Sequence, residues 1–293
     1  MKTRRFHLIL ILLYLVGIAT IVFVAWTGRE YYTLPLIERP RAEMHALLKP
    51  GGAWGHTLGI VGTAMLLLLL LYSARKRRRF GLRRGRLSRW LDVHIWLGIM
   101  GPAFITLHSS LKLHGIVSVS YYSMLAVMIS GFVGRYIYIQ IPRDEAGAAI
   151  PLREIDAKIE ELGRHLIERY GITPEMLARI DRRAWTPRGK GGLDSLFEIF
   201  LADLMRPLRS HLLLRFVKRT HPGLPAGVAG EIARLANRKA LLRRRRELLK
   251  TMSTFLHHWH VIHKPFAYVM LIIMFVHIGV VVAMGEGIQG SWN

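Results

Sequence analysis

Four histidines at a matched spacing are the residues of this chain best suited to chemistry. His94 and His108 are fourteen residues apart, and so are His263 and His277. In an α-helix, a step of fourteen residues returns to within about 40° of the same face and advances about 21 Å along the axis. Two such helices side by side would offer two stacked pairs of imidazoles. This geometry suits two haems, each held by a pair of axial histidines.

Both histidine pairs lie in segments that are long and apolar enough to cross a bilayer. The mean hydropathy of +0.27 and the 52% share of hydrophobic residues also indicate a membrane protein. We therefore expect an all-α integral membrane protein with a five-helix transmembrane bundle. The lipid bilayer is one of its expected partners. The five spans are predicted at about 6–26, 56–72, 90–113, 116–139 and 261–284.

Basic residues set the expected orientation of these spans. Lys2, Arg4 and Arg5 precede the first span, and nine Lys or Arg residues lie between Arg75 and Arg89, after the second. Because Lys and Arg collect on the cytoplasmic side of a membrane, the N-terminus is expected in the cytoplasm and the C-terminus outside. The expected location is a bacterial inner (cytoplasmic) membrane.

This orientation makes the third and fifth spans parallel, and it assigns each histidine a partner. His94 pairs with His263 near the cytoplasm, and His108 pairs with His277 near the outer surface. These four residues are the predicted axial ligands of two haem b groups.

Small and charged residues on the same helices could complete the haem sites. Gly98 and Gly101 share the histidine face of the third span, where a missing side chain would admit a haem edge; ordinary close helix packing is the alternative role for both. The residues that could pair with haem propionates are Arg89, Lys112, Arg135 and Lys264.

The chain divides into four expected regions. Residues 1–55 hold the first span and an outside loop with a short helix near 42–48, and residues 56–142 hold spans two to four. Residues 143–254 form a basic cytoplasmic helical insert, and residues 255–293 hold the fifth span and an outside tail. Within the insert we expect helices after Pro151 and Pro174 and over 193–217 and 231–250, with a loop at 186–192. The insert could lie on an anionic membrane surface or be fully solvated.

Composition excludes several other chemistries. The absence of cysteine rules out disulfides, thiolate metal sites and thioether-attached haem within this chain. The formal net charge is +23, but the basic runs flank apolar spans and no recognition motif is present, so nucleic acid is not an expected partner.

Other histidines leave two further interpretations open. His257, His258 and His260 precede His263 and could bind a non-haem metal as part of an enzyme. Alternatively, the intramembrane histidines could line a path for metal ions or protons. His56 and His114 lie near the expected outer surface as spare ligands.

The two H-x13-H helices resemble the di-haem cytochrome b arrangement. It is found in the cytochrome b of quinol-oxidising bc complexes and in the ferric reductase/NADPH oxidase transmembrane domain. The resemblance implies that His94, His108, His263 and His277 ligate two b haems and that the bundle moves electrons across the membrane. Ferric reductases usually have six spans and a flavin module. This chain has five predicted spans and no flavin or dinucleotide fingerprint, and its insert is not part of either common core.

The resemblance also implies the kind of redox partners. Without a flavin or iron–sulfur module, the chain would act as an electron-transfer subunit of a respiratory or quinone-linked oxidoreductase. A quinol in the bilayer or a docked redox subunit could exchange electrons at one side, and a c-type cytochrome at the other. Quinone sites have no sequence signature that distinguishes them, so a bound quinone, and with it quinol oxidation or quinone reduction by this chain, stays open.

Overall fold

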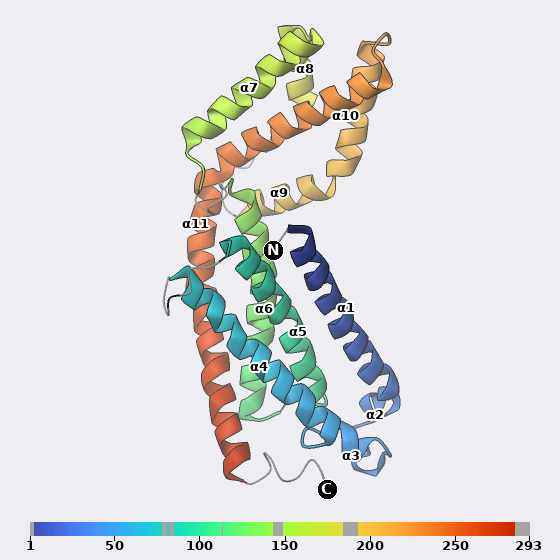
Figure 1. Cartoon of the computed structure of the whole chain (residues 1–293), viewed down its shortest axis with the longest axis vertical. Coiled ribbons are helices and arrows are strands. Elements are labelled where there is room, and N and C mark those ends of the chain that lie inside the picture. Colours follow the sequence, from blue (N-terminus) through green and yellow to red (C-terminus); the bar gives the residue numbers. More distant parts are fainter. Residues whose placement is uncertain are drawn as a thin grey trace. The chain divides into compact units, whose positions relative to one another are not determined.

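The computed structural model describes residues 3–77, 81, 85–112, 114–142, 149–183 and 193–284 (Figure 1). Every regular element in these ranges is a helix. Five helices are long and apolar enough to cross a membrane, which confirms the all-helical prediction with five candidate spans. They are Arg4–Thr27, His45–Lys76, Leu87–His108, Ile116–Gln140 and Ala226–Ala283.

The helices follow one another in the order shown in Figure 1. Their bounds are α1 (Thr3–Thr27), α2 (Arg29–Thr33), η1 (Arg39–Arg41), α3 (His45–Leu48), α4 (Ala53–Lys76), α5 (Leu87–His108), α6 (Ile116–Gln140), α7 (Leu152–Tyr170), α8 (Pro174–Arg183), α9 (Leu193–Leu204), α10 (Arg206–Thr220) and α11 (Ala226–Ala283). Several predicted segments lie outside the described residues: most of the basic run between 78 and 84, the loop at 186–192 and the tail after Met284.

Three helix boundaries differ from the predicted ones. Helix α5 ends at His108 instead of near residue 113, because Ser110 and Leu111 adopt left-handed conformations with φ of 48° and 59°. The predicted helix over 193–217 is split into α9 and α10, since Pro207 lacks the backbone N–H that an unbroken helix needs. The predicted helices 231–250 and 261–284 form the single helix α11, because no Gly or Pro interrupts residues 231–264.

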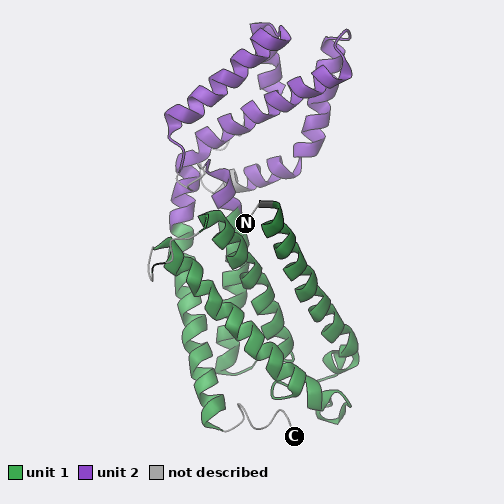
Figure 2. Ribbon diagram, in the orientation of Figure 1, with its two compact units in different colours: residues 1–135, 258–293 green, residues 136–257 purple. Residues whose placement is uncertain are grey.

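The chain forms two compact units (Figure 2). Unit 1 is Met1–Arg135 together with His258–Asn293, and unit 2 is Tyr136–His257. Helix α11 contributes its first part to unit 2 and its last part to unit 1.

Unit 1 has two apolar cores that share helices α4 and α5. In the first core, α1 and the short helices α2 and α3 pack against α4 and α5 through buried residues that include Val24, Tyr31, Leu48 and Met100. In the second core, Leu66 of α4 packs with side chains of α6 and α11 that include Met270. Large apolar side chains such as Phe23, Ile60, Phe132 and Phe275 remain exposed on the outside of these helices.

Unit 2 also has two cores. Helices α7 and α8 are strongly amphipathic, and their apolar faces pack with α10 and α11 around Leu166, Ile180, Val217 and Ile232. The end of α6, α9 and the middle of α11 form the other core, with Ile137, Ile141, Ile199, Leu248 and Met252.

Candidate functional site

The four predicted ligands lie in unit 1, two on α5 and two on α11. All four side chains are half-buried. His94 lies within electrostatic range of His263, and His277 lies within electrostatic range of His108. The folded chain therefore brings the two expected partners of each pair into each other's neighbourhood.

Helix α4 holds both histidines of α5 in the same way. His94 Nδ1 lies 3.3 Å from the carbonyl oxygen of Leu69, and His108 Nδ1 lies 2.9 Å from that of Gly55. A carbonyl oxygen can only accept a hydrogen bond, so Nδ1 carries the proton in both rings. In the neutral form of each ring, the Nε2 atom then keeps its lone pair. Histidines that bind a metal through one ring nitrogen commonly donate a hydrogen bond from the other ring nitrogen to a backbone carbonyl.

Gly59 of α4 leaves room for the His108 ring of α5. A Cβ atom at Gly59 would stand only 2.6 Å from His108 Nδ1. One turn further along, a Cβ atom at Gly62 would stand 2.9 Å from the Ile105 side chain. The missing side chains allow α5 to approach α4 and let His108 reach the Gly55 carbonyl.

Ser130 of α6 orients His263 of α11. Its hydroxyl donates to the carbonyl of Val127 at 2.9 Å, so its remaining lone pair is the acceptor for His263 Nδ1 at 2.7 Å. His263 therefore also carries its proton on Nδ1 and keeps the Nε2 lone pair. This is the third histidine of the four in the same protonation state.

Trp259 packs beside His263 at the same place. The ring centroids are 4.6 Å apart with planes at 33°, and the indole N–H donates to the Ser130 carbonyl at 2.7 Å. Gly134 admits the indole, because a Cβ atom there would lie 2.3 Å from the Trp259 ring. The His263 ring is thus held by a hydrogen bond and by an aromatic neighbour.

His277 is held less firmly than the other three histidines. It makes no hydrogen bond with the residues that the structure describes, and it interacts electrostatically with His108. His56 also interacts with His108, whereas His114 lies exposed between α5 and α6.

The two predicted glycines have different surroundings. A Cβ atom at Gly101 would meet Leu66 at 3.3 Å and Met65 at 3.4 Å, so Gly101 lies against α4. This contact fits the helix-packing role considered for it. At Gly98 the nearest such atom is a Leu69 methyl carbon at 3.8 Å. A haem-facing role for either glycine stays a prediction.

Some of the charged residues considered as propionate partners have protein neighbours. Arg135 lies 3.8 Å from the Asp92 carboxylate, and the Arg89 guanidinium lies 5.5 Å from the Phe6 ring centre. Lys112 and Lys264 are exposed.

The cluster before His263 forms no ready metal site in the described part of the chain. Across those residues, no three or more His, Asp or Glu side chains are grouped so as to hold a metal ion. Lys76 Nζ lies 3.5 Å from His260 Nε2. A pair of axial ligands for one haem needs only two histidines, so this finding does not bear on the four residues above.

Sequence reasoning did not identify Ser130, Trp259 or Gly134. Trp259 carries a usable signal, since it precedes His263 by four residues and so shares its face of the helix. Ser130 carries none, because its role depends on the way α6 packs beside α11.

Protein-family models, curated proteins and solved structures were compared with this chain, and none matches it.

Proposed function

We propose that this chain is a membrane electron-transfer protein with two bis-histidine haem b groups. His94 and His263 would hold one haem, and His108 and His277 the other. When bound, such haems supply one-electron redox chemistry with no open coordination position for a substrate. Within this proposal, the chain is similar to the di-haem cytochromes b in its ligands and differs from them in its basic insert.

The observation that carries the proposal is the hydrogen bonding of the histidines at Nδ1. Three of the four rings donate Nδ1–H to a backbone or hydroxyl oxygen: His94, His108 and His263. Such a bond fixes the ring orientation and makes Nε2 a better donor to iron. Histidines that only filled space in a bundle would not need a common tautomer on two different helices.

The membrane setting is supported by the five apolar helices and by the large apolar side chains exposed on them. Contiguous exposed apolar surface of this kind is typical of contact with lipid. The excess of basic residues between the second and third spans supports a cytoplasmic N-terminus. A quinol or a docked redox subunit would then exchange electrons with the inner haem, and a c-type cytochrome with the outer one.

The test is a reduced-minus-oxidised absorption spectrum of the purified chain and of four variants. We expect a low-spin b-type spectrum with two haems per chain. His94→Ala or His263→Ala should remove one haem, and His108→Ala or His277→Ala the other. The matched controls His56→Ala and His114→Ala should keep both.

Two outcomes would count against the proposal, and a third would show that the variants are unsuitable. Absence of a haem spectrum would overturn it and would favour a histidine-lined path for protons or metal ions. Loss of the same haem in His94→Ala and His277→Ala would overturn the pairing. Loss of both haems in the His56 or His114 control would show that the assay reports misfolding.

A further inference from the structure

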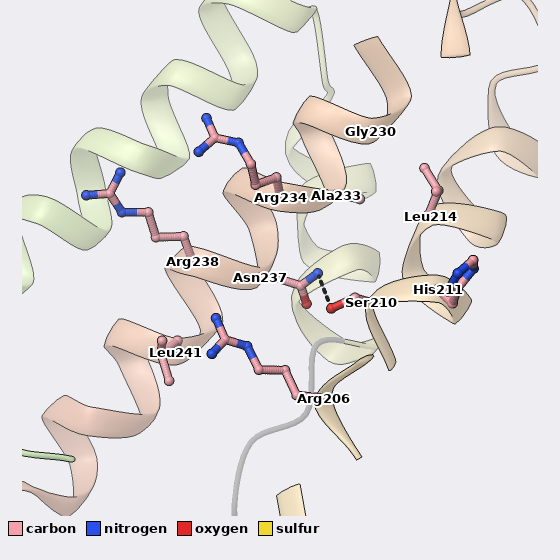
Figure 3. Close-up of a pocket in the computed structure, with 10 residues that line it drawn as sticks. All are labelled: Arg206, Ser210, His211, Leu214, Gly230, Ala233, Arg234, Asn237, Arg238 and Leu241. Carbon is pink, nitrogen blue, oxygen red and sulfur yellow. Dashed lines mark hydrogen bonds between the residues drawn. The ribbon is translucent and has the colours of Figure 1, made fainter. Parts of the chain in front are cut away.

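Unit 2 contains a pocket of about 470 Å³ between α10 and α11. Figure 3 shows the hydrogen bond from Asn237 Nδ2 to Ser210 Oγ, 3.3 Å long, in the middle of the lining residues. The guanidinium groups of Arg206, Arg234 and Arg238 lie on one side of it in this view, and the His211 ring lies on the other. The lining is completed by Leu214, Gly230, Ala233 and Leu241.

The spacing of the lining residues along α10 and α11 places them on the two helix faces that form the pocket. On α10, Arg206, Ser210 and Leu214 recur every four residues and so share one face. On α11, Arg234, Arg238 and Leu241 are spaced by four and three residues and also share a face. The two faces meet over the pocket, with apolar side chains beside the polar ones.

The charge of the lining is one-sided. Three arginines and a histidine line the pocket, and no carboxylate does. Glu231 pairs with Arg234, but Arg206 and Arg238 form no ion pair with the residues that the structure describes. Like charges four residues apart on a helix, such as Arg234 and Arg238, destabilise it. An anion in the pocket would remove that cost.

Neighbouring basic residues of α11, in contrast, have acidic partners. Lys239 pairs with Asp181 at 2.8 Å, Arg244 with Asp203 at 2.6 Å, and Arg246 with Asp156 at 2.9 Å. The fold therefore supplies acidic partners along this stretch of α11, Arg234 included, and supplies none to Arg206 and Arg238 among the residues that the structure describes. The pocket volume falls in the range of small-molecule sites.

We propose that this pocket binds a phosphate-bearing anion. Arginine forks bind phosphate oxygens through paired hydrogen bonds, which a lone lysine cannot reproduce. The Ser210 hydroxyl accepts from Asn237, so its own hydrogen is available to donate to the ligand. The phosphate belongs either to an acidic lipid headgroup or to a soluble organic phosphate. The proposal is independent of the haem proposal and concerns other residues.

The experiment is isothermal titration of the purified full chain in a zwitterionic detergent. The first probe is inorganic pyrophosphate, and the second is short-chain phosphatidylglycerol, with short-chain phosphatidylcholine and sodium chloride at matched ionic strength as blanks. We expect saturable binding of at least one phosphate probe. Saturation by pyrophosphate alone identifies a soluble ligand, and saturation by phosphatidylglycerol alone identifies a lipid headgroup.

Variants test whether the pocket is the site. Arg206→Gln with Arg238→Gln should weaken binding by roughly tenfold or more, since two charge-assisted contacts are lost. The matched control is Arg215→Gln with Arg219→Gln, which removes equal charge from exposed positions of α10 away from the pocket; it should bind as the original chain does.

Arg238→Lys serves as a second variant if the double change prevents folding. It keeps the charge on an exposed side chain but removes the fork, so binding should weaken several-fold. No saturable binding of either probe, or equal weakening in the pocket and control variants, would overturn the proposal.

Discussion

Ser130 is the residue on which the orientation of His263 depends most directly. Its hydroxyl accepts the Nδ1 proton of His263, and its carbonyl accepts the indole proton of Trp259. Ser130→Ala removes the first contact and keeps the second. In the proposed haem site, a residue in this role would position the ligand without touching the iron.

If the proposed inner haem is bound, we expect Ser130→Ala to weaken its retention by roughly 10- to 100-fold and to shift its midpoint potential, because the His263 ring loses its fixed orientation. The outer haem should be unaffected. The measurement is a redox titration of the reduced-minus-oxidised spectrum, with Ser118→Ala on the same helix as control. Ser130→Thr keeps the hydroxyl and should restore the original potential. Unchanged potentials in Ser130→Ala would contradict this role.

At this scale the sequence predicted part of the site. The spacing of His94 and His108, matched by His263 and His277, is enough to propose two pairs, since helical geometry converts spacing into face and depth. The carbonyls of Gly55 and Leu69 and the hydroxyl of Ser130 leave no mark in the sequence. They become partners only once α4 and α6 are packed, and that packing depends on side chains far apart along the chain.

The end of α5 is fixed by a loop that the sequence showed only as polar. Arg39, which is 5% exposed, donates to the carbonyls of Leu34 and Tyr32 at 3.0 and 2.9 Å and also to that of Ser110. The Ser110 hydroxyl donates to the Leu48 carbonyl at 2.6 Å. These bonds hold Ser110 and Leu111 in their left-handed conformations directly after His108.

Arg39→Gln should therefore lower the stability of unit 1 by about 3 kcal/mol, because it removes charge-assisted hydrogen bonds to one buried and two part-buried carbonyls. The expected change is a fall in Tm of roughly 5–10 °C in a thermal melt of the purified chain. Arg41→Gln, at an exposed position two residues away, is the control and should change the Tm little. Equal Tm values for the Arg39→Gln and Arg41→Gln variants would show that the Arg39 contacts contribute no stability.

The elements were predictable to different degrees. Five apolar runs predicted the five long helices, because their length alone distinguishes them. Pro151 and Pro174 marked the starts of α7 and α8 correctly. The sequence does not predict the continuity of α11, since the change from a basic to an apolar composition near residue 255 indicates a boundary that the helix does not have. Composition changes there, but nothing in the backbone chemistry stops the helix.

At the scale of the whole molecule, Asp203 joins separate parts of unit 2. Its carboxylate accepts from Tyr136 at 3.0 Å, Gln140 at 2.8 Å and Arg244 at 2.6 Å. Burial alone would raise the pKa of Asp203, but the hydrogen bonds from Arg244, Gln140 and Tyr136 outweigh it and hold the pKa below its ordinary value. The charged form is therefore favoured by folding.

This pKa predicts how stability depends on pH. A carboxylate with a depressed pKa stabilises the fold above its unfolded pKa of about 3.9, and the contribution is lost as pH falls through the folded pKa. We expect Asp203→Asn to cost roughly 3 kcal/mol at neutral pH, because Arg244 is left buried without its partner. The difference in Tm between the two chains should shrink below about pH 4.

Thermal melts at a series of pH values measure this difference. Glu160→Gln, which neutralises an exposed carboxylate on α7, is the control and should give a curve parallel to that of the original chain. A pH-independent difference between Asp203→Asn and the original chain would exclude the titration of Asp203 as its cause.

The bonds of Asp203 also connect the start of unit 2 with α11. Tyr136 and Gln140 lie where the chain begins unit 2, and Arg244 lies on the helix by which it leaves. The start of unit 2 and this stretch of α11 are thus held at one carboxylate, and Ile141 and Leu248 share a core beside it. Loss of the Asp203 carboxylate would therefore release the point at which the chain enters unit 2 from its contact with α11.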